Sequence, residues 1–133
     1  MEDKWIYVGI FLDEDSQEAL RDLFPTPTGW KSYYNHMTVV YNDYSELAKA
    51  VKDFNEGNLE EDFPLTVIAV GISEKAMAVK VRLPLGVVCA NPTAHITLSV
   101  SPNGTPYDSN NIQNWHETDE FELWGTMKVY TGK

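Results

Sequence analysis

Two segments of this chain repeat the same alternation of polar and apolar residues. They are residues 35–41 (NHMTVVY) and residues 94–100 (AHITLSV). Side chains of a β-strand point to opposite faces with a period of two. In the first segment His36 and Thr38 therefore share one face, and in the second His95 and Thr97 share one face. A fold with these strands must bury the apolar face of each and leave an imidazole and a hydroxyl on the other.

Each His-x-Thr tripeptide combines two side chains that suit chemistry at phosphorus. An imidazole moves a proton near neutral pH, and a hydroxyl can hold a phosphate oxygen. If the two strands face each other, the pairs form a symmetric acid–base device around one phosphorus atom. The candidate catalytic residues are therefore His36, Thr38, His95 and Thr97.

A third tripeptide, His116-Glu117-Thr118, has the same spacing and shows that the pattern alone has low specificity. It lies in a polar stretch, residues 114–120, without the apolar alternation that follows the other two histidines. We expect His116 to lie in a surface loop outside the site.

Other interpretations of the histidines remain open at this point. Half-buried strand histidines with satisfied hydrogen bonds are a common structural feature. A zinc site would need a third well-placed ligand, which the sequence does not offer beside His36 and His95. A Ser–His–acid triad is not indicated either, because there is no nucleophile elbow. We expect no metal and no other cofactor.

The bulk composition predicts one folded domain. The chain has 133 residues, of which 43% are hydrophobic, enough for a real core. Cys89 is the only cysteine, so no internal disulfide framework is possible. The first residues lack the pattern of a signal peptide, and no apolar run has the length of a membrane span. We expect a single domain over residues 1–133 in the cytoplasm, or in the host cytoplasm if the protein is viral.

The net charge of −10 argues against a long nucleic-acid tract as partner, because Lys and Arg dominate such binding. A small phosphate ligand held by a few local donors remains possible. The basic residues that could supply local charge are Lys31, Lys80, Arg82, Lys128 and Lys133. We interpret most of them as surface charges that keep the protein soluble.

The alternation and breaker residues predict a chain of strands with two clear helices. Strands are expected at residues 5–12, 31–41, 63–70, 76–83, 94–101 and 121–130, with a short extended piece at 86–90. Helices are expected to start at Asp13 and at Ser45, the second one closing at Gly57. Residues 109–115 are expected to form a short helix or a loop.

The expected faces of three strands bear on the site. The first strand has a gap in one face at Gly9, which allows a ligand or a neighbouring strand to approach. In the first motif strand, Val40 is expected on the face of the two catalytic candidates. In the second, the residues from His95 to Ser101 form a wholly polar face, open to solvent or lining a wet cleft.

With its two His-x-Thr motifs and this order of elements, the chain resembles the 2H phosphoesterases over most of its length. Residues 94–98 and 129–133 resemble the myelin 2′,3′-cyclic-nucleotide phosphodiesterases. Residues 105–110 (TPYDSN) are similar to a segment of fungal tRNA-ligase phosphodiesterase domains and of phage RNA-repair-like proteins. The interval before the second motif is shorter than in bacterial RNA-ligase-like members, which carry a helix there.

The resemblance implies a bilobal α+β fold. It has two mostly antiparallel sheets related by a pseudo-twofold axis, helices on the outer faces and a central cleft. His36 and His95 would be the acid–base pair, and Thr38 and Thr97 would donate hydrogen bonds to phosphate oxygens. A nucleobase could stack on an aromatic side chain near the cleft, for which the candidates are Tyr7, Trp30 and Tyr130.

The sequence therefore supports several functions. The first is a metal-independent phosphodiesterase that hydrolyses a cyclic phosphodiester, such as the 2′,3′-cyclic phosphate of a nucleotide or RNA end. An alternative is a phage anti-defence enzyme that cleaves cyclic oligonucleotide messengers. Further alternatives are an inactive module that sequesters a nucleotide and an interaction protein whose motifs are coincidental. The oligomeric state is left open.

Overall fold

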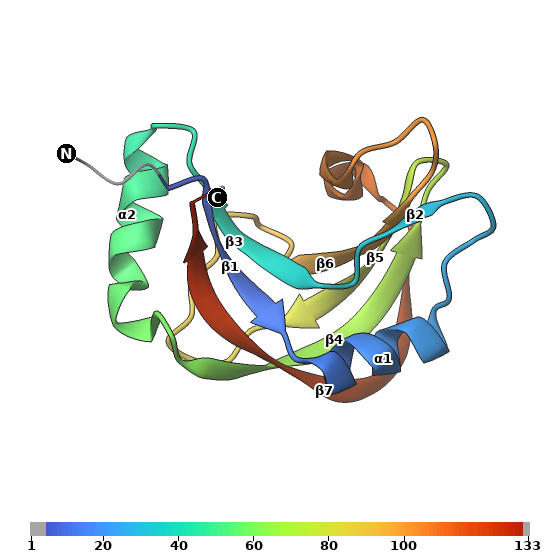
Figure 1. The fold of residues 1–133 in the computed structure, drawn as a ribbon, viewed down its shortest axis with the longest axis horizontal. Helices are drawn as coiled ribbons and strands as arrows, with labels where there is room; N and C mark the ends of the chain where they lie inside the picture. Colours follow the sequence, from blue (N-terminus) through green and yellow to red (C-terminus); the bar gives the residue numbers. More distant parts are fainter. Residues whose placement is uncertain (1–4, 132–133) are drawn as a thin grey trace.

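The structure is a computed structural model in which residues 5–131 are described. Lys133, and with it the end of the segment 129–133 that resembles the myelin phosphodiesterases, lies outside the described residues. Figure 1 shows a strongly curved sheet with two α-helices at its periphery. In chain order the elements are β1 (Tyr7–Leu12), α1 (Glu14–Leu23), β2 (Lys31–Ser32), β3 (His36–Tyr41), α2 (Glu46–Phe54), η1 (Glu56–Asn58), β4 (Asp62–Ile72), β5 (Ala76–Arg82), β6 (His95–Val100), η2 (Pro106–Asn111) and β7 (Trp115–Tyr130). Among the described helices, none is long and apolar enough to cross a membrane.

The strands form one antiparallel sheet that closes on itself. Their order is β2-β6-β3-β1-β7-β4-β5, and β6 also pairs with β5. The expected α+β class with mostly antiparallel strands is confirmed. The expected two separate sheets are not found, because β6 is hydrogen-bonded to β3 on one side and to β5 on the other. The pseudo-twofold relation stays a prediction.

Both α-helices begin where the sequence predicts. The Asp13 carboxylate accepts a hydrogen bond from the Ser16 amide (2.8 Å) and caps α1. The Ser45 hydroxyl accepts one from the Ala48 amide (3.1 Å) and caps α2. The hydroxyl of Ser16 also accepts from the amide of Trp124 (2.8 Å), which ties α1 to β7.

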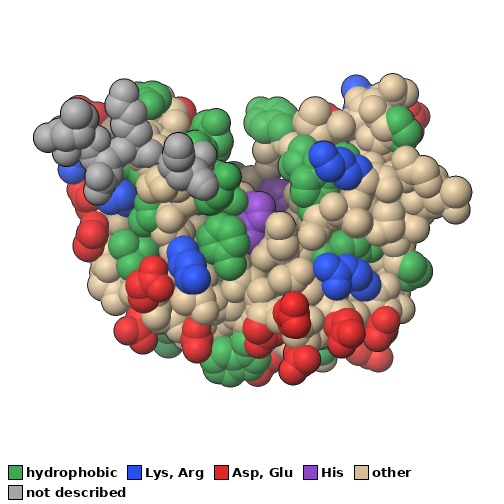
Figure 2. Space-filling model, viewed as in Figure 1, with side chains coloured by type: hydrophobic (Ala, Val, Ile, Leu, Met, Phe, Trp, Pro, Cys, Tyr) green, Lys and Arg blue, Asp and Glu red, His purple; other side chains and the backbone are tan. Residues whose placement is uncertain are grey.

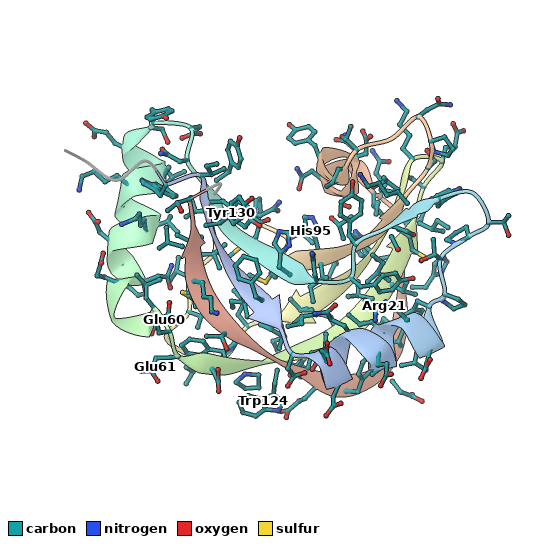
Figure 3. All side chains as sticks on the ribbon, viewed as in Figure 1. Arg21, Glu60, Glu61, His95, Trp124 and Tyr130 are labelled. Carbon is teal, nitrogen blue, oxygen red and sulfur yellow. The ribbon has the colours of Figure 1, made fainter. Side chains whose placement is uncertain are left out.

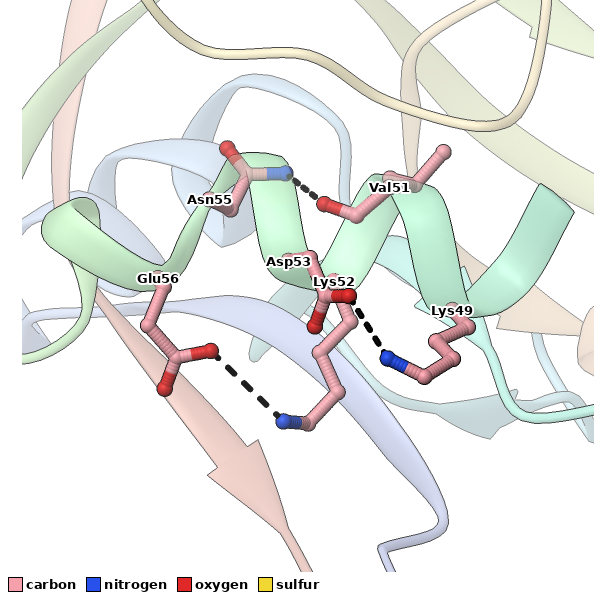
Figure 4. A network of polar contacts seen from close by, with 6 residues as sticks. All are labelled: Lys49, Val51, Lys52, Asp53, Asn55 and Glu56. Atoms are coloured by element: carbon pink, nitrogen blue, oxygen red, sulfur yellow. Dashed lines mark hydrogen bonds and ion pairs between the residues drawn. The ribbon is translucent and has the colours of Figure 1, made fainter. Parts of the chain in front are cut away.

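The end of α2 differs from the expectation. The helix ends at Phe54, before Gly57, because the fully buried side chain of its C-cap residue Asn55 holds the chain there. Its amide nitrogen donates to the carbonyl oxygens of Val51 and Val88, both at 2.9 Å. Figure 4 shows the bond to Val51 beside two ion pairs of α2. Asn55 thus ties α2 to the loop that precedes β6.

The expected single strand over residues 31–41 is broken into β2 and β3. Tyr34 lies between them in the left-handed region, at φ 58°. Its ring is fully buried, and its hydroxyl donates to the carbonyl of Phe24. The strand is interrupted at Tyr34, because a residue at positive φ cannot continue a strand.

A β-bulge at Val39 makes the expected faces of β3 wrong beyond Thr38. β1 pairs Gly9 with Thr38 but Val8 with Val40, so Val39 is the extra residue. Val40 is therefore buried, and Tyr41, 62% exposed, lies on the face of the catalytic candidates instead. Sequence alternation carries no sign of such an insertion.

The two faces of β6 fit the expectation only in part. Its apolar residues Ile96, Leu98 and Val100 are buried, as predicted. The polar face does not stay open, because Ser99 is fully buried and Ser101 is 8% exposed. The pairing of β5 with β6 shifts register at this point, so the face turns into the protein after Thr97.

Candidate active site

The two His-x-Thr tripeptides cross each other. β3 and β6 pair at Met37 and Ile96, the middle residues of the two tripeptides. In an antiparallel pair, each motif histidine then lies across from the threonine of the other motif. Met37 and Ile96 are fully buried, so the pleat turns the histidines and threonines to the opposite face. The fold thereby brings together two motifs that are far apart in the sequence.

All four catalytic candidates line one cavity of about 860 Å³. Figure 2 shows a hollow between two shoulders of the molecule with histidine at its floor. In Figure 3, His95 lies in the middle of this groove. One wall is formed by β3 and the first turn of α2, and the other by η2. Other side chains lining the cavity are Tyr33, Asn35, Tyr41, Asp43, Asn91, Tyr107 and Asn110.

The ring of His36 is held on three sides. Its Nδ1–H donates to the side-chain oxygen of Asn35 (2.9 Å), and its Nε2 lies 3.2 Å from the hydroxyl of Thr38. The ring stacks on Tyr7 and Phe11, with centroids 5.1 and 5.3 Å away. Burial lowers the pKa of His36 below its ordinary value. In the neutral form Nε2 is an acceptor, as a general base requires.

The ring of His95 is also oriented by a hydrogen bond from Nδ1, as the ring of His36 is. Its Nδ1–H donates to the carbonyl oxygen of Thr93 (2.9 Å), because a carbonyl can only accept. Neutral His95 therefore has its lone pair on Nε2. Burial lowers the pKa of His95, and the bond to Thr93 partly offsets this shift.

The two motif threonines have different partners. Thr38 contacts the His36 ring of its own motif, whereas the Thr97 hydroxyl lies 2.8 Å from the hydroxyl of Ser109. Ser109 lies on η2 and is 1% exposed, so its position is fixed by packing. Sequence reasoning did not single out Ser109. A signal for η2 is the Thr105-x-x-Asp108 spacing of a capping box, and in the structure the Thr105 amide donates to the Asp108 carboxylate (2.8 Å).

A family model of the fungal tRNA ligase phosphodiesterase domain matches residues 17–130. The chain belongs to this family. The family is one of the 2H phosphoesterases, so the resemblance drawn from the two motifs is confirmed. No curated protein sequence matches the chain.

A crystal structure of a fungal RNA kinase has a similar fold, with a TM-score of 0.71 and 12% sequence identity. The match covers 98% of this chain and 46% of the kinase chain, so this domain spans less than half of that protein. At such low identity the likeness shows the fold alone.

In this phosphodiesterase-family domain, two of the three substrate-binding candidates, Tyr7 and Tyr130, belong to the ring stack that includes His36, although neither lines the cavity. Tyr7 pairs with Tyr41 on one side and with Tyr130 on the other, which forms a row of tyrosines across β3, β1 and β7. Tyr7 stacks on Tyr130 at 5.0 Å as well as on His36. Burial raises the pKa of the Tyr7 hydroxyl. Their role in binding stays a prediction.

The gap expected at Gly9 is filled by these rings. A Cβ at Gly9 would lie 3.1 Å from the Tyr7 ring, 3.1 Å from the Met37 carbonyl and 3.4 Å from the His36 ring. The glycine therefore makes room for the close approach of the neighbouring strand β3, at the Met37 carbonyl, and for the stack that holds His36.

The third candidate, Trp30, packs against the main hydrophobic core and does not line the cavity. The aromatic residues that do line it are Tyr33, Tyr41 and Tyr107. Tyr33 follows the short strand β2, and Lys31 lies over its ring at 5.5 Å from the centroid. Tyr33, next to the break at Tyr34 that the sequence did not reveal, lines the cavity, whereas Trp30 does not.

His116 lies outside the cavity, as expected, but not in a loop. β7 is longer than predicted and begins at Trp115, with His116 exposed and paired with Val70. Hydrogen bonding to β4 extends this strand although its residues lack apolar alternation. Within residues 5–131, no group of three or more His, Cys, Asp or Glu is placed to hold a metal ion.

The basic residues Arg82, Lys128 and Lys80 lie in different environments relative to the cavity. Arg82 forms an exposed ion pair with Glu120 (2.7 Å), as expected for a surface charge. Lys128 pairs with Gly9, which is itself opposite Thr38, so it lies on the strand face of the site. Lys80 pairs with His95 and lies over the ring of Trp115, 5.2 Å from its centroid.

Proposed function

We propose that the protein is a metal-independent phosphodiesterase that opens a 2′,3′-cyclic phosphate on a nucleotide or RNA end. Membership of the tRNA ligase phosphodiesterase family supports a phosphoesterase role and an RNA substrate. The observation that carries the proposal is the crossing of the two motifs at Met37 and Ile96, which turns both imidazoles into one cavity.

The reaction needs two proton transfers on opposite sides of phosphorus. One neutral histidine takes a proton from water as its oxygen bonds to phosphorus. The other, protonated, histidine gives a proton to the ribose oxygen as its bond to phosphorus breaks. The product is a phosphate monoester, and a second proton exchange with solvent restores the pair. Both rings use Nδ1 as a hydrogen-bond donor to the protein, which leaves Nε2 of each for this exchange.

The threonines suit the non-bridging phosphate oxygens. Charge grows on these oxygens in the transition state, and hydroxyl donors fixed in advance stabilise it. Thr97 can donate toward the cavity if Ser109 donates to it. Thr38 must release His36 when a phosphate arrives, because the two are 3.2 Å apart in the free site.

A substrate panel with product analysis tests the proposal. Purified protein with EDTA is given 2′,3′-cyclic mononucleotides, RNA with a 2′,3′-cyclic end, 3′,5′-cyclic nucleotides and cyclic dinucleotides. We expect hydrolysis of the 2′,3′-cyclic phosphates to a single monoester isomer, unchanged by EDTA.

The other outcomes point to the alternatives. Cleavage confined to the cyclic dinucleotides would favour the anti-defence enzyme. Stable nucleotide binding without turnover would favour the sequestering module. Loss of turnover in EDTA, restored by zinc, would favour a metal site and contradict the proposal.

A further inference from the structure

Lys80 is a basic residue on β5, the strand next to that of His95. The two residues are direct partners across β5 and β6, so their side chains leave the sheet on the same face. The ammonium group lies 5.2 Å from the Trp115 ring centroid. None of the ion pairs formed among residues 5–131 includes Lys80. In a chain of net charge −10, a lysine at this place with no carboxylate partner among the described residues favours an anion.

A second pocket of about 290 Å³ adjoins the main cavity on this side. His95, Asn91, Tyr107 and Asn110 line both, so the two pockets adjoin at His95. Most of the side chains lining it can form hydrogen bonds; besides His95 and Trp115 these are Asn91, Thr93, Tyr107, Ser109 and Asn110. Trp115 also lines this pocket.

The ring of Trp115 packs closely against β4. A Cβ at Gly71 would lie 2.8 Å from this ring and 2.6 Å from Ile112, so the glycine lets the indole lie close to β4. Lys80 itself lines neither pocket, and the cation–π contact holds its ammonium group over the ring of Trp115, which lines the second one.

We propose that the second pocket binds a phosphate group of the substrate other than the reacting one, with Lys80 supplying the positive charge. This inference rests on the proposed function, because that function puts the reacting phosphate between the two histidines. It predicts a preference for substrates with two phosphates over a cyclic mononucleotide. The second phosphate has two possible sources, a 5′-phosphate on the same nucleotide or the diester that links it to the next.

Calorimetric binding of product-like ligands tests the subsite without turnover. The ligands are adenosine 2′-monophosphate, adenosine 2′,5′-bisphosphate and the dinucleotide ApA with a terminal 2′-phosphate. We expect the wild type to bind at least one two-phosphate ligand about tenfold more tightly than the monophosphate at low salt. Whichever of the two gains the affinity identifies the source.

Lys80→Gln should abolish this preference and leave binding of the monophosphate unchanged, whereas Lys80→Arg should retain it. Lys49→Gln, on α2, makes the same change in net charge and should retain the preference. Equal wild-type affinities for all three ligands would overturn the inference. It would also be overturned if Lys80→Gln weakened all three equally, since that is the effect of a structural role.

Turnover of a 2′,3′-cyclic nucleotide separates this inference from the proposed function. A Lys80-dependent preference without turnover would leave the subsite standing and contradict the function. Turnover without any preference for a second phosphate would support the proposed function and contradict the subsite.

Discussion

Met37 pairs with Ile96 across β3 and β6, and both side chains are fully buried. This one antiparallel contact between the middle residues of the two tripeptides determines the geometry of the site. It turns both polar pairs to the same face, and each imidazole is then held by a donor bond from Nδ1. The buried pair is therefore the structural basis of the proposed two-histidine chemistry.

Gly9→Ala should lower activity through the ring stack. The new methyl group would meet the Tyr7 ring and the Met37 carbonyl at 3.1 Å, tighter than an ordinary contact. We expect a cost of about 1–3 kcal/mol in unfolding free energy. The displaced His36 should reduce kcat roughly tenfold to a hundredfold. Urea unfolding and steady-state kinetics measure the two effects.

Gly57→Ala is the matched control, because nothing lies within 4 Å of a Cβ there. It should leave both measurements near the wild-type values. Equal activity of the two variants would show that the stack on His36 does not matter for turnover.

Ser109→Ala should act through Thr97. Removing the Ser109 hydroxyl frees the Thr97 hydroxyl to rotate away from the cavity, so kcat should fall about tenfold. In a Thr97→Ala background the same change should cost almost nothing, since no hydroxyl is left to orient. Full additivity of the two losses in kcat would indicate a general effect of η2 packing.

Asn55→Ala should destabilise the protein through the loop before β6. The carbonyl oxygen of Val88 would lose its 2.9 Å donor, and the Asn55 site is fully buried. We expect a loss of about 1–3 kcal/mol in unfolding free energy, measured by urea denaturation. Lys49→Gln breaks an exposed ion pair on the same helix and should leave stability nearly unchanged. An equal effect of the two variants would contradict this interpretation.

Stability should fall as the pH drops through the range where the motif histidines titrate. Burial lowers the pKa of both His36 and His95 below 6.5. Between the folded value and 6.5 the unfolded chain binds more protons, so the unfolding free energy rises with pH in that window. The stabilisation is complete above 6.5 and is lost as the pH falls through the folded values.

Thermal unfolding between pH 5 and 7 measures this dependence. His36→Gln combined with His95→Gln should flatten the slope. A wild-type Tm that does not change across this range would contradict the assigned burial effect.

The sequence predicts much of the local structure, because caps and alternation are local signals. Asp13 and Ser45 start their helices as expected, and the apolar face of β6 is buried. The two motifs also line one cavity, as the resemblance implied.

The parts that sequence reasoning missed depend on long-range contacts. The bulge at Val39 and the left-handed Tyr34 arise from pairing and burial that no local pattern encodes. Closure of the sheet through β5 and β6 is also a tertiary event. The contact between Thr97 and Ser109 joins two segments whose alignment depends on how η2 packs.

The central claim is that His36 and His95 act as one unit on one phosphorus. The direct measurement is kcat on RNA with a 2′,3′-cyclic end for His36→Ala, His95→Ala, their combination and His116→Ala. We predict a loss of about 10²–10⁴ for each single motif variant and little further loss in the combination. His116→Ala should remain near wild type. Retention of most activity in either single motif variant, or losses that multiply in the combination, would contradict the account.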